Sequence, residues 1–208
     1  MGDRIVRGTA IVSLGAQVII GALTSVGFAY ELPDPRENEQ LRVILTLELG
    51  SQVVEFLWYV YAIACVHETR TWTRYIDWVL STPVMLVSTA LFLSHRNEGM
   101  LFEAPLTDPL LYVALAFNWL MLLLGYLVEI ARIPWTPGIL GGTMALVGTF
   151  TILATYVDVG DTLSNALFWT MYAVWAAYGG AAILSYTPKN IAYNALDVVS
   201  KNMYGLFL

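Results

Sequence analysis

The sequence is dominated by seven apolar stretches, each about as long as the roughly 20 residues that a helix needs to cross a bilayer. They fall at roughly residues 8–30, 42–66, 72–94, 107–127, 138–157, 165–186 and 191–208. The links between them are short and carry most of the charges, prolines and other turn formers. Because short links force successive helices to run antiparallel, the pattern predicts an all-α membrane protein folded as a seven-transmembrane-helix bundle.

Composition supports a single membrane domain over residues 1–208. The chain is 58% hydrophobic and only 12% charged, which is more apolar than a soluble domain could bury. Its formal net charge of −6 offers no basic patch for nucleic acid. Cys65 is the single cysteine, so the chain has no internal disulfide and gives no sign of a paired-cysteine metal site. The first apolar stretch lacks a small-residue cleavage site, and we expect it to be retained as the first helix.

Lys201 lies inside the last apolar stretch and is one of only two lysines in the chain. An ammonium group in hydrocarbon costs at least ~2.5 kcal/mol, so it needs a counter-ion, a cavity or a covalent partner. Asp197 lies one turn earlier on the same helical face and can offset the charge. A desolvated lysine can also act as an amine nucleophile that forms a Schiff base with an aldehyde. The alternative is a structural Lys–Asp pair that ties helices together.

Polar side chains form stripes on three of the predicted helices. The stripe of the second helix is Glu48, Ser51, Gln52 and Glu55; that of the last is Asn190, Asn194, Asp197 and Lys201; the first helix has Ser13, Gln17 and Thr24. Each set recurs at helical spacing, which indicates a polar face directed into the bundle. Interhelical hydrogen bonding explains Ser13 and Gln17 best. Carboxylates at membrane depth are expensive, so for Glu48 and Glu55 we favour water between the helices and a functional role.

The third predicted helix supplies a further buried carboxylate. Asp77, Ser81 and Ser88 recur at helical spacing and face one direction, and Arg74 lies one turn before Asp77. Pro83 is tolerated within this helix because neighbouring helices can satisfy the carbonyl that it frees. Together with the last helix, this predicts a buried cluster of Lys201 between Asp77 and Asp197, moderated by Arg74.

These residues resemble a known family, the microbial (type 1) rhodopsins. Arg74-Tyr-Ile-Asp77-Trp78 followed by Ser81-Thr82-Pro83 resembles that family's third-helix signature, and Leu196-Asp197-Val-Val-Ser-Lys201 resembles its retinal-attachment segment. The resemblance implies all-trans retinal bound to Lys201 as a protonated Schiff base, with Asp77 as primary counter-ion and proton acceptor and Asp197 as second counter-ion. It implies a retinal pocket formed by Trp78, Ser81, Met85, Trp169 and Tyr172.

The resemblance also implies a light-responsive protein that is not an enzyme, with retinal, ions and the lipid bilayer as partners and a homo-oligomer as a further expectation. It places the N-terminus outside the cell. The loops alone argue the opposite by the positive-inside rule, since the N-terminal side collects more basic residues, namely Arg4, Arg7, Arg70, Arg132 and Lys189, against Arg36, Arg42 and Arg96. We follow the motifs.

Two departures from the family pattern bear on the kind of transport. Ser88 stands where family proton pumps carry a carboxylate donor, and Ala173 follows Tyr172 where a proline is usual. The polar stripes resemble those of light-gated cation channels, including the rhodopsins of giant algal viruses. The predicted ion path is Arg74, Glu48, Glu55, Ser13, Gln52, Ser88, Asn194 and Asn202. We therefore expect a light-gated cation channel, since carboxylates favour cations. The alternatives are an outward proton pump in which Glu48 or Glu55 replaces the missing donor, a sensor that signals through a partner, and a membrane protein that binds no retinal.

Overall fold

The computed structural model describes residues 2–65, 70–97 and 100–203, with side chains described up to Lys201. Within these residues the chain forms seven long helices: α1 (Gly2–Val26), α2 (Pro35–Ala64), α3 (Arg74–Arg96), α5 (Pro109–Glu129), α6 (Trp135–Leu153), α7 (Thr162–Ala182) and α8 (Tyr186–Asp197). A single helical turn, α4 (Ala104–Thr107), lies in the link between α3 and α5. Short 3₁₀ turns occupy Gly27–Ala29, Thr71–Thr73 and Ala154–Tyr156, and α8 continues as a π-helix over Val198–Met203.

The predicted seven-helix bundle is confirmed, although several helices begin earlier than their apolar stretches. The second helix begins at Pro35, well before residue 42, because Asp34 caps it by accepting a hydrogen bond from the amide of Arg36 at 2.8 Å. Asp108 and Asp161 cap α5 and α7 in the same way. The first helix begins at Gly2 and the last at Tyr186, so polar turns extend both beyond the apolar runs.

Five of the described helices, each taken with its adjoining 3₁₀ turn where it has one, are long and apolar enough to cross a membrane by length and composition: Gly2–Ala29, Pro35–Ala64, Thr71–Arg96, Pro109–Glu129 and Trp135–Tyr156. The helices α7 and α8 fall outside that count. The segment α8 is only 12 residues long and carries several polar side chains, including Asp197.

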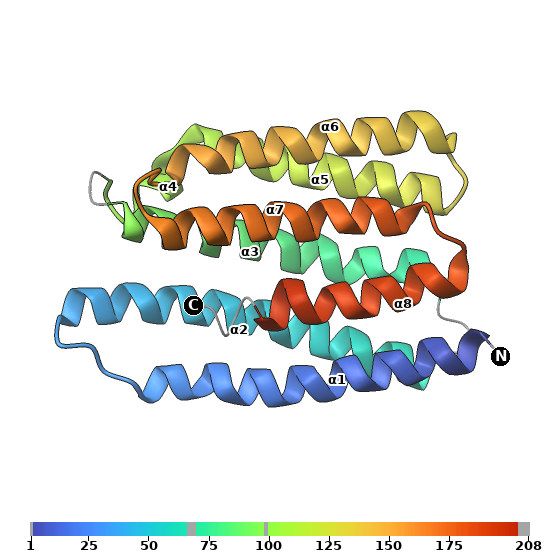
Figure 1. The fold of residues 1–208 in the computed structure, drawn as a ribbon, viewed down its shortest axis with the longest axis horizontal. Coiled ribbons are helices and arrows are strands. Elements are labelled where there is room, and N and C mark those ends of the chain that lie inside the picture. Colours follow the sequence, from blue (N-terminus) through green and yellow to red (C-terminus); the bar gives the residue numbers. More distant parts are fainter. Residues whose placement is uncertain (1, 66–69, 98–99, 204–208) are drawn as a thin grey trace.

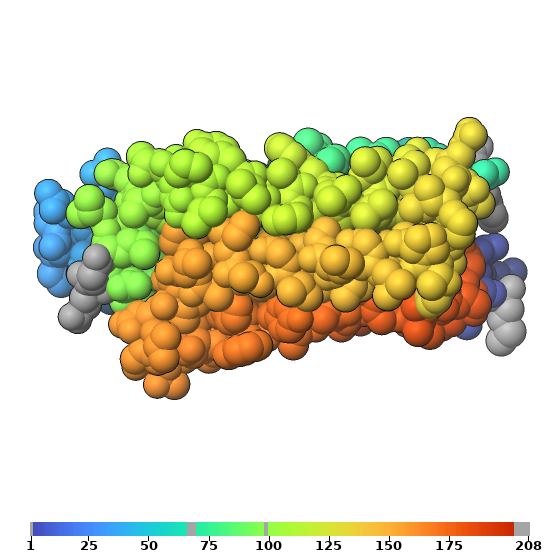
Figure 2. Space-filling view, turned by 90° about the horizontal axis from the view of Figure 1, so that it is seen from above, coloured from blue at the N-terminus to red at the C-terminus, as the bar shows by residue number. Residues whose placement is uncertain are grey.

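The helices lie side by side along a common axis (Figure 1). The pair α1 and α2 forms one edge of the bundle and the pair α5 and α6 the opposite edge, with α3, α7 and α8 between them. The first and last helices, α1 and α8, pack against each other. Seen from above, α5, α6 and α7 make up most of the visible face, with parts of α2 and α3 at its edges (Figure 2).

The bundle has an apolar half and a polar half. Met85, Leu86, Leu146, Phe150 and Trp175 belong to one buried apolar cluster that joins α3, α6 and α7. By contrast, the side of α2 that faces α1 buries the polar stripe predicted from the sequence. Helix α3 lies between the two halves, which explains why it buries residues of both kinds.

Pro83 interrupts the hydrogen bonding of α3 without a visible loss of helix. A proline in a helix leaves the carbonyl four residues earlier without its usual donor, and here that carbonyl belongs to Val79. The indole nitrogen of Trp119 on α5 donates to it at 3.3 Å. The expectation that a neighbouring helix would satisfy the freed carbonyl is therefore confirmed.

Candidate functional site

Lys201 lies in the π-helical turn that follows α8, and its side chain is buried in the bundle. Its ammonium nitrogen Nζ donates to Asp77 Oδ2 of α3 at 2.5 Å. A second carboxylate oxygen, Glu55 Oε1 of α2, lies 3.9 Å from the same nitrogen. The ammonium therefore lies between carboxylates from two other helices, as a buried charge requires.

Asp197 forms its ion pair with a different cation. Its Oδ2 accepts hydrogen bonds from Arg74 Nη1 and from the hydroxyl of Tyr59, both at 2.8 Å, and its Oδ1 accepts from the hydroxyl of Tyr178 at 2.6 Å. Sequence reasoning grouped Asp197 with Lys201 because they lie one turn apart. In the described part of the chain, the second carboxylate within ion-pair distance of Lys201 is Glu55 instead.

Arg74 is buried and fully engaged. Besides Asp197, its guanidinium donates to the side-chain oxygens of Asn194 and, at 3.4 Å, Asn190. It also lies over the ring of Trp58, 4.5 Å from the centroid. Residues of both α2 and α8 thus hold Arg74, the cation predicted to moderate the carboxylates. Tyr59 and Tyr178, which belong to the same network, were not singled out from the sequence.

A cavity of about 820 Å³, counting its open mouth, lies next to Lys201 in the apolar half of the bundle. Its wall includes Trp78, Met85, Trp175 and Tyr178, and Lys201 reaches it from the polar side. The rings of Trp78 and Tyr178 meet edge to face at 5.3 Å between centroids. This arrangement offers an aromatic, mostly apolar chamber with one amine in its wall.

The prediction that Trp169 and Tyr172 line the cavity is wrong. Trp169 is 61% exposed on the outer face of α7, and Tyr172 packs against Phe150 in the apolar cluster. Trp175 and Tyr178 stand in their place. The spacing Trp-x-x-Tyr occurs twice in this helix, six residues apart, and six residues rotate a helix by about 240° beyond a full turn. The recurrence of Ser164, Leu167, Phe168, Met171 and Trp175 as one buried face is the signal that identifies the correct pair.

The corrected register also moves the position of the expected family proline from residue 173 to residue 179. The residue after Tyr178 is Gly179, which lines the cavity. A Cβ at this position would meet no atom within 4 Å, so Gly179 leaves open space in the wall. Ser81 is buried but is not part of the wall; its hydroxyl donates to the backbone carbonyl of Asp77 at 3.0 Å.

The polar stripes of α1 and α2 meet inside the bundle. Gln17 Nε2 donates to Glu55 Oε2 at 2.7 Å and to the backbone carbonyl of Gln52 at 3.1 Å. The hydroxyl of Ser13 donates to the backbone carbonyl of Asn194 at 2.9 Å. Interhelical hydrogen bonding by Ser13 and Gln17 is therefore confirmed, and Glu48 and Glu55 are buried beside them.

One residue of the predicted path, Ser88, stands apart from this region, and another, Asn202, cannot be placed. Ser88 is buried in α3, where its hydroxyl donates to the backbone carbonyl of Met85 at 3.0 Å. The side chain of Asn202 lies outside the described residues. A buried polar residue that sequence reasoning missed is Asn118 of α5, which donates to the hydroxyl of Thr82 at 2.9 Å. It is an isolated amide in an apolar helix, which is a signal the sequence does carry.

A family model described as bacteriorhodopsin-like protein matches residues 9–208. The chain belongs to this family. Among solved structures, viral rhodopsin OLPVRII superposes with a TM-score of 0.86 and 25% identity, covering 97% of this chain and 94% of that one. The blue light-absorbing proteorhodopsin from Med12 superposes with a TM-score of 0.76 at 17% identity, covering 97% and 95% of the two chains, which shows the fold alone.

The curated relatives have longer chains. Halorhodopsin of Halorubrum sodomense is 25% identical over 71% of this chain and 55% of its own, and the opsin-like protein carO of Fusarium fujikuroi is 23% identical over 74% and 52%. The chain spans about half the length of the curated relatives it matches. Membership confirms a multi-pass membrane protein of a family of pumps, channels and sensors, which are not enzymes, and it implies retinal as the cofactor.

The residues present fit that cofactor. An apolar chamber with Trp78 and Trp175 in its wall suits a conjugated hydrocarbon chain, and Lys201 supplies the amine that an aldehyde requires. The other lysine, Lys189, forms an ion pair with Glu129 at 2.9 Å and does not line the cavity. Asp77 Oδ1 is buried without a hydrogen-bond partner among the described residues, so the carboxylate keeps an acceptor site beside the amine.

Proposed function

We propose that the protein holds retinal covalently at Lys201 and acts as a light-gated cation channel. Retinal supplies a light-driven change of shape when it is bound. The rest of the proposal concerns what this chain's own residues do around Nζ. Asp77 and Glu55 keep a positive charge on that nitrogen, since two anions at 2.5 and 3.9 Å favour the protonated form.

The observation that carries the channel proposal is the buried polar face between α1 and α2. It leads from Glu48 through Ser51 and Gln52 to Glu55, next to Lys201. Several side-chain atoms along it have no hydrogen-bond partner among the described residues. Buried polar groups are normally satisfied by protein or water, so the face supports a hydrated route between the helices. Its carboxylates favour cations over anions.

An outward proton pump remains the second candidate, because one observation favours it. Glu55 Oε1 lies 3.9 Å from Lys201 Nζ, so a protonated Glu55 can return a proton to the nitrogen through one bridging water, and a pump needs only one such donor. A channel instead needs a continuous hydrated path. The two proposals therefore differ in what neutralising Glu55 should do.

Flash photolysis and photocurrents of Glu55→Gln test this choice, with Glu48→Gln alongside. For a channel, Glu55→Gln changes conductance or selectivity, and Lys201 regains its proton at a similar rate because protons arrive through water. For a pump, the same change slows proton return by ~10²- to 10⁴-fold, since a positioned donor typically contributes that much. Slow proton return that azide restores, with no reversible current in the parent protein, would contradict the channel proposal.

A further inference from the structure

The contacts between α1 and α2 fix which residues of the two helices face each other. Gln17 reaches Glu55 and the backbone of Gln52, and a Cβ on Gly21 would lie 3.3 Å from Gln52 Oε1. The helices run antiparallel, so moving forward along α1 corresponds to moving backward along α2. Thr24, seven residues after Gln17, therefore faces Glu48, seven residues before Glu55. Seven residues are about two helical turns, so Thr24 lies on the same face of α1 as Gln17, and Glu48 lies on the same face of α2 as Glu55.

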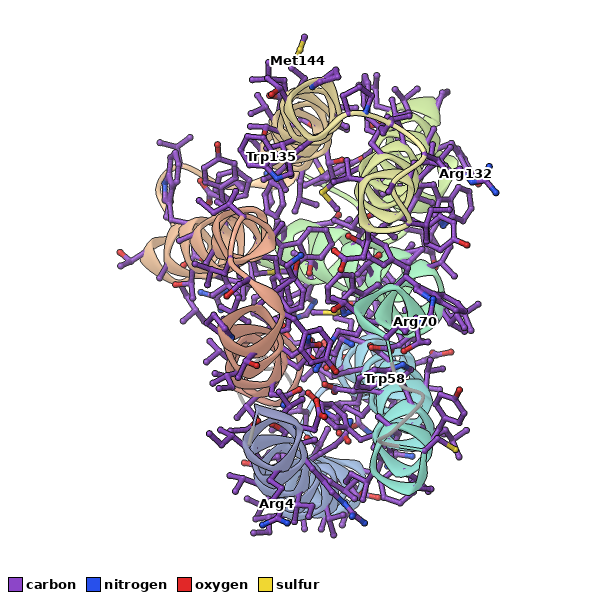
Figure 3. The ribbon with its side chains drawn as sticks, turned by 90° about the vertical axis from the view of Figure 1, so that its right-hand side faces the viewer. Arg4, Trp58, Arg70, Arg132, Trp135 and Met144 are labelled. Carbon is purple, nitrogen blue, oxygen red and sulfur yellow. The ribbon has the colours of Figure 1, made fainter. Side chains whose placement is uncertain are left out.

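At this level of the bundle, several buried side-chain oxygen atoms have no hydrogen-bond partner among the described residues. Glu48 is fully buried, and neither of its carboxylate oxygens has a hydrogen-bond partner among the described residues. The same holds for the hydroxyls of Thr24 and Ser51 and for both the oxygen and the nitrogen of the Gln52 side chain, all on residues at least nine-tenths buried. Figure 3 looks along the bundle from the end at which α1 begins, with α1 at the bottom and α2, marked by Trp58, beside it.

The buried charges in the described part of the chain do not balance. Four carboxyl groups are buried, on Glu48, Glu55, Asp77 and Asp197, against the two cations Arg74 and Lys201. Asp77 and Glu55 lie beside Lys201, and Asp197 lies beside Arg74. Glu48 has no cation within ion-pair distance among the described residues. A buried carboxylate without a partner is costly, so Glu48 needs either a nearby cation or a proton.

We propose that Glu48, Thr24 and Gln52 form a binding site for a small hard monovalent cation of the Na⁺ type, which is held there in the dark. Carboxylate, amide and hydroxyl oxygens are the ligands that such cations prefer. A proton on Glu48 would neutralise the charge without binding the surrounding oxygens, and water would bind these oxygens without neutralising the charge. One cation neutralises the carboxylate and contacts several of them at once.

This inference rests on the proposed function only in that the site lies on the proposed ion path. It concerns binding in the dark, without light or current. The two ideas can therefore fail separately: a protein that binds Na⁺ at Glu48 but drives a one-way current would overturn the channel and leave the site.

Infrared difference spectra of the retinal-loaded protein in lipid discs, kept in the dark, test the site. Buffer containing Na⁺ is exchanged for buffer of equal ionic strength and pH containing N-methylglucamine, a cation too large to enter. We expect a saturable change in the carboxylate stretching bands of the parent protein. Glu48→Gln should lose that change, and Thr24→Val should raise the half-saturating Na⁺ concentration about 10-fold, because one oxygen ligand is lost.

Glu39→Gln is the matched control, since it neutralises an exposed carboxylate on the same helix and should respond to Na⁺ as the parent does. Retained visible absorbance in each variant establishes that it is folded. A parent protein with no Na⁺-dependent band would overturn the site and leave water or a proton at Glu48. A Glu48→Gln variant with the parent's response, or a Thr24→Val variant with unchanged affinity, would also overturn it.

Discussion

At the scale of single residues, the groups around Lys201 determine how its buried charge is stabilised. This side chain brings a positive charge into the bundle, and its ammonium group lies within ion-pair distance of two carboxylates, Asp77 on α3 and Glu55 on α2. Replacing one member of such a buried group leaves the others unpaired, which is strongly destabilising. Tests at this site therefore need variants that preserve charge as well as variants that remove it.

Lys201→Ala should abolish the visible absorbance that develops on adding retinal, because no other described lysine reaches the cavity. Lys201→Arg should be equally colourless, since it keeps the charge beside Asp77 but lacks the nucleophilic amine. Lys189→Arg, at the lysine paired with Glu129, should colour as the parent does. Normal colour in either Lys201 variant would refute the attachment site.

Neutralising the two carboxylates should shift the absorption maximum to different extents. A negative charge near the nitrogen holds positive charge at that end of the chromophore, and removing it lets the charge spread, which shifts absorption to the red. Asp77 Oδ2 lies 2.5 Å from Lys201 Nζ and Glu55 Oε1 lies 3.9 Å from it. Asp77→Asn should therefore shift the absorption maximum further than Glu55→Gln. Absorption spectra of the purified variants measure this directly. An unshifted maximum in Glu55→Gln would remove Glu55 from the counter-ion group.

At the scale of helices, the register of α7 decides which aromatic side chains meet the cavity. Trp175 is buried in the wall and Trp169 faces outward, although both belong to the same Trp-x-x-Tyr spacing. Trp175→Phe should therefore move the absorption maximum and slow pigment formation. Trp169→Phe, the matched control, should leave both unchanged. A spectrum altered by Trp169→Phe and not by Trp175→Phe would return the register to the one predicted from the sequence.

The helices differ in how well the sequence predicted them. In α3 one motif combines Arg74, Asp77 and Pro83 at fixed spacing, so its buried face followed directly. In α7 a repeated motif gave two possible registers, and only the periodicity of the whole buried face separates them. The place of Glu55 in the second helix already predicts that it lies near mid-membrane beside the Schiff base, but its approach to Lys201 Nζ at 3.9 Å depends on how α2 packs against the π-helical turn after α8.

At the scale of the whole molecule, the bundle separates two environments. The cavity next to Lys201 lies in the apolar half, among α3, α5, α6 and α7. Most buried carboxylates and amides lie in the polar half, among α1, α2, α3 and α8, whereas the buried amide of Asn118 lies on α5. Lys201 lies where the two halves meet, so its nitrogen borders both environments. This division agrees with the proposal that light absorption and ion movement involve different helices.

The outer surface of the bundle agrees with a bilayer on all sides. Large apolar side chains such as Leu140, Met144 and Trp169 are exposed on the outside of the helices. Figure 3 shows Met144 pointing away from the bundle at its upper edge, while Arg4, Arg70 and Arg132 mark the end at which the chain begins. Which side of the membrane this end faces stays a prediction: the family pattern places it outside the cell.

Voltage clamp of cells that express the retinal-loaded protein tests whether light opens a passive path for cations. We predict a photocurrent that reverses sign at a voltage set by the cation gradient and that vanishes when no gradient and no voltage are applied. A photocurrent of one direction that persists without a gradient, at every voltage, would contradict the channel and identify a pump.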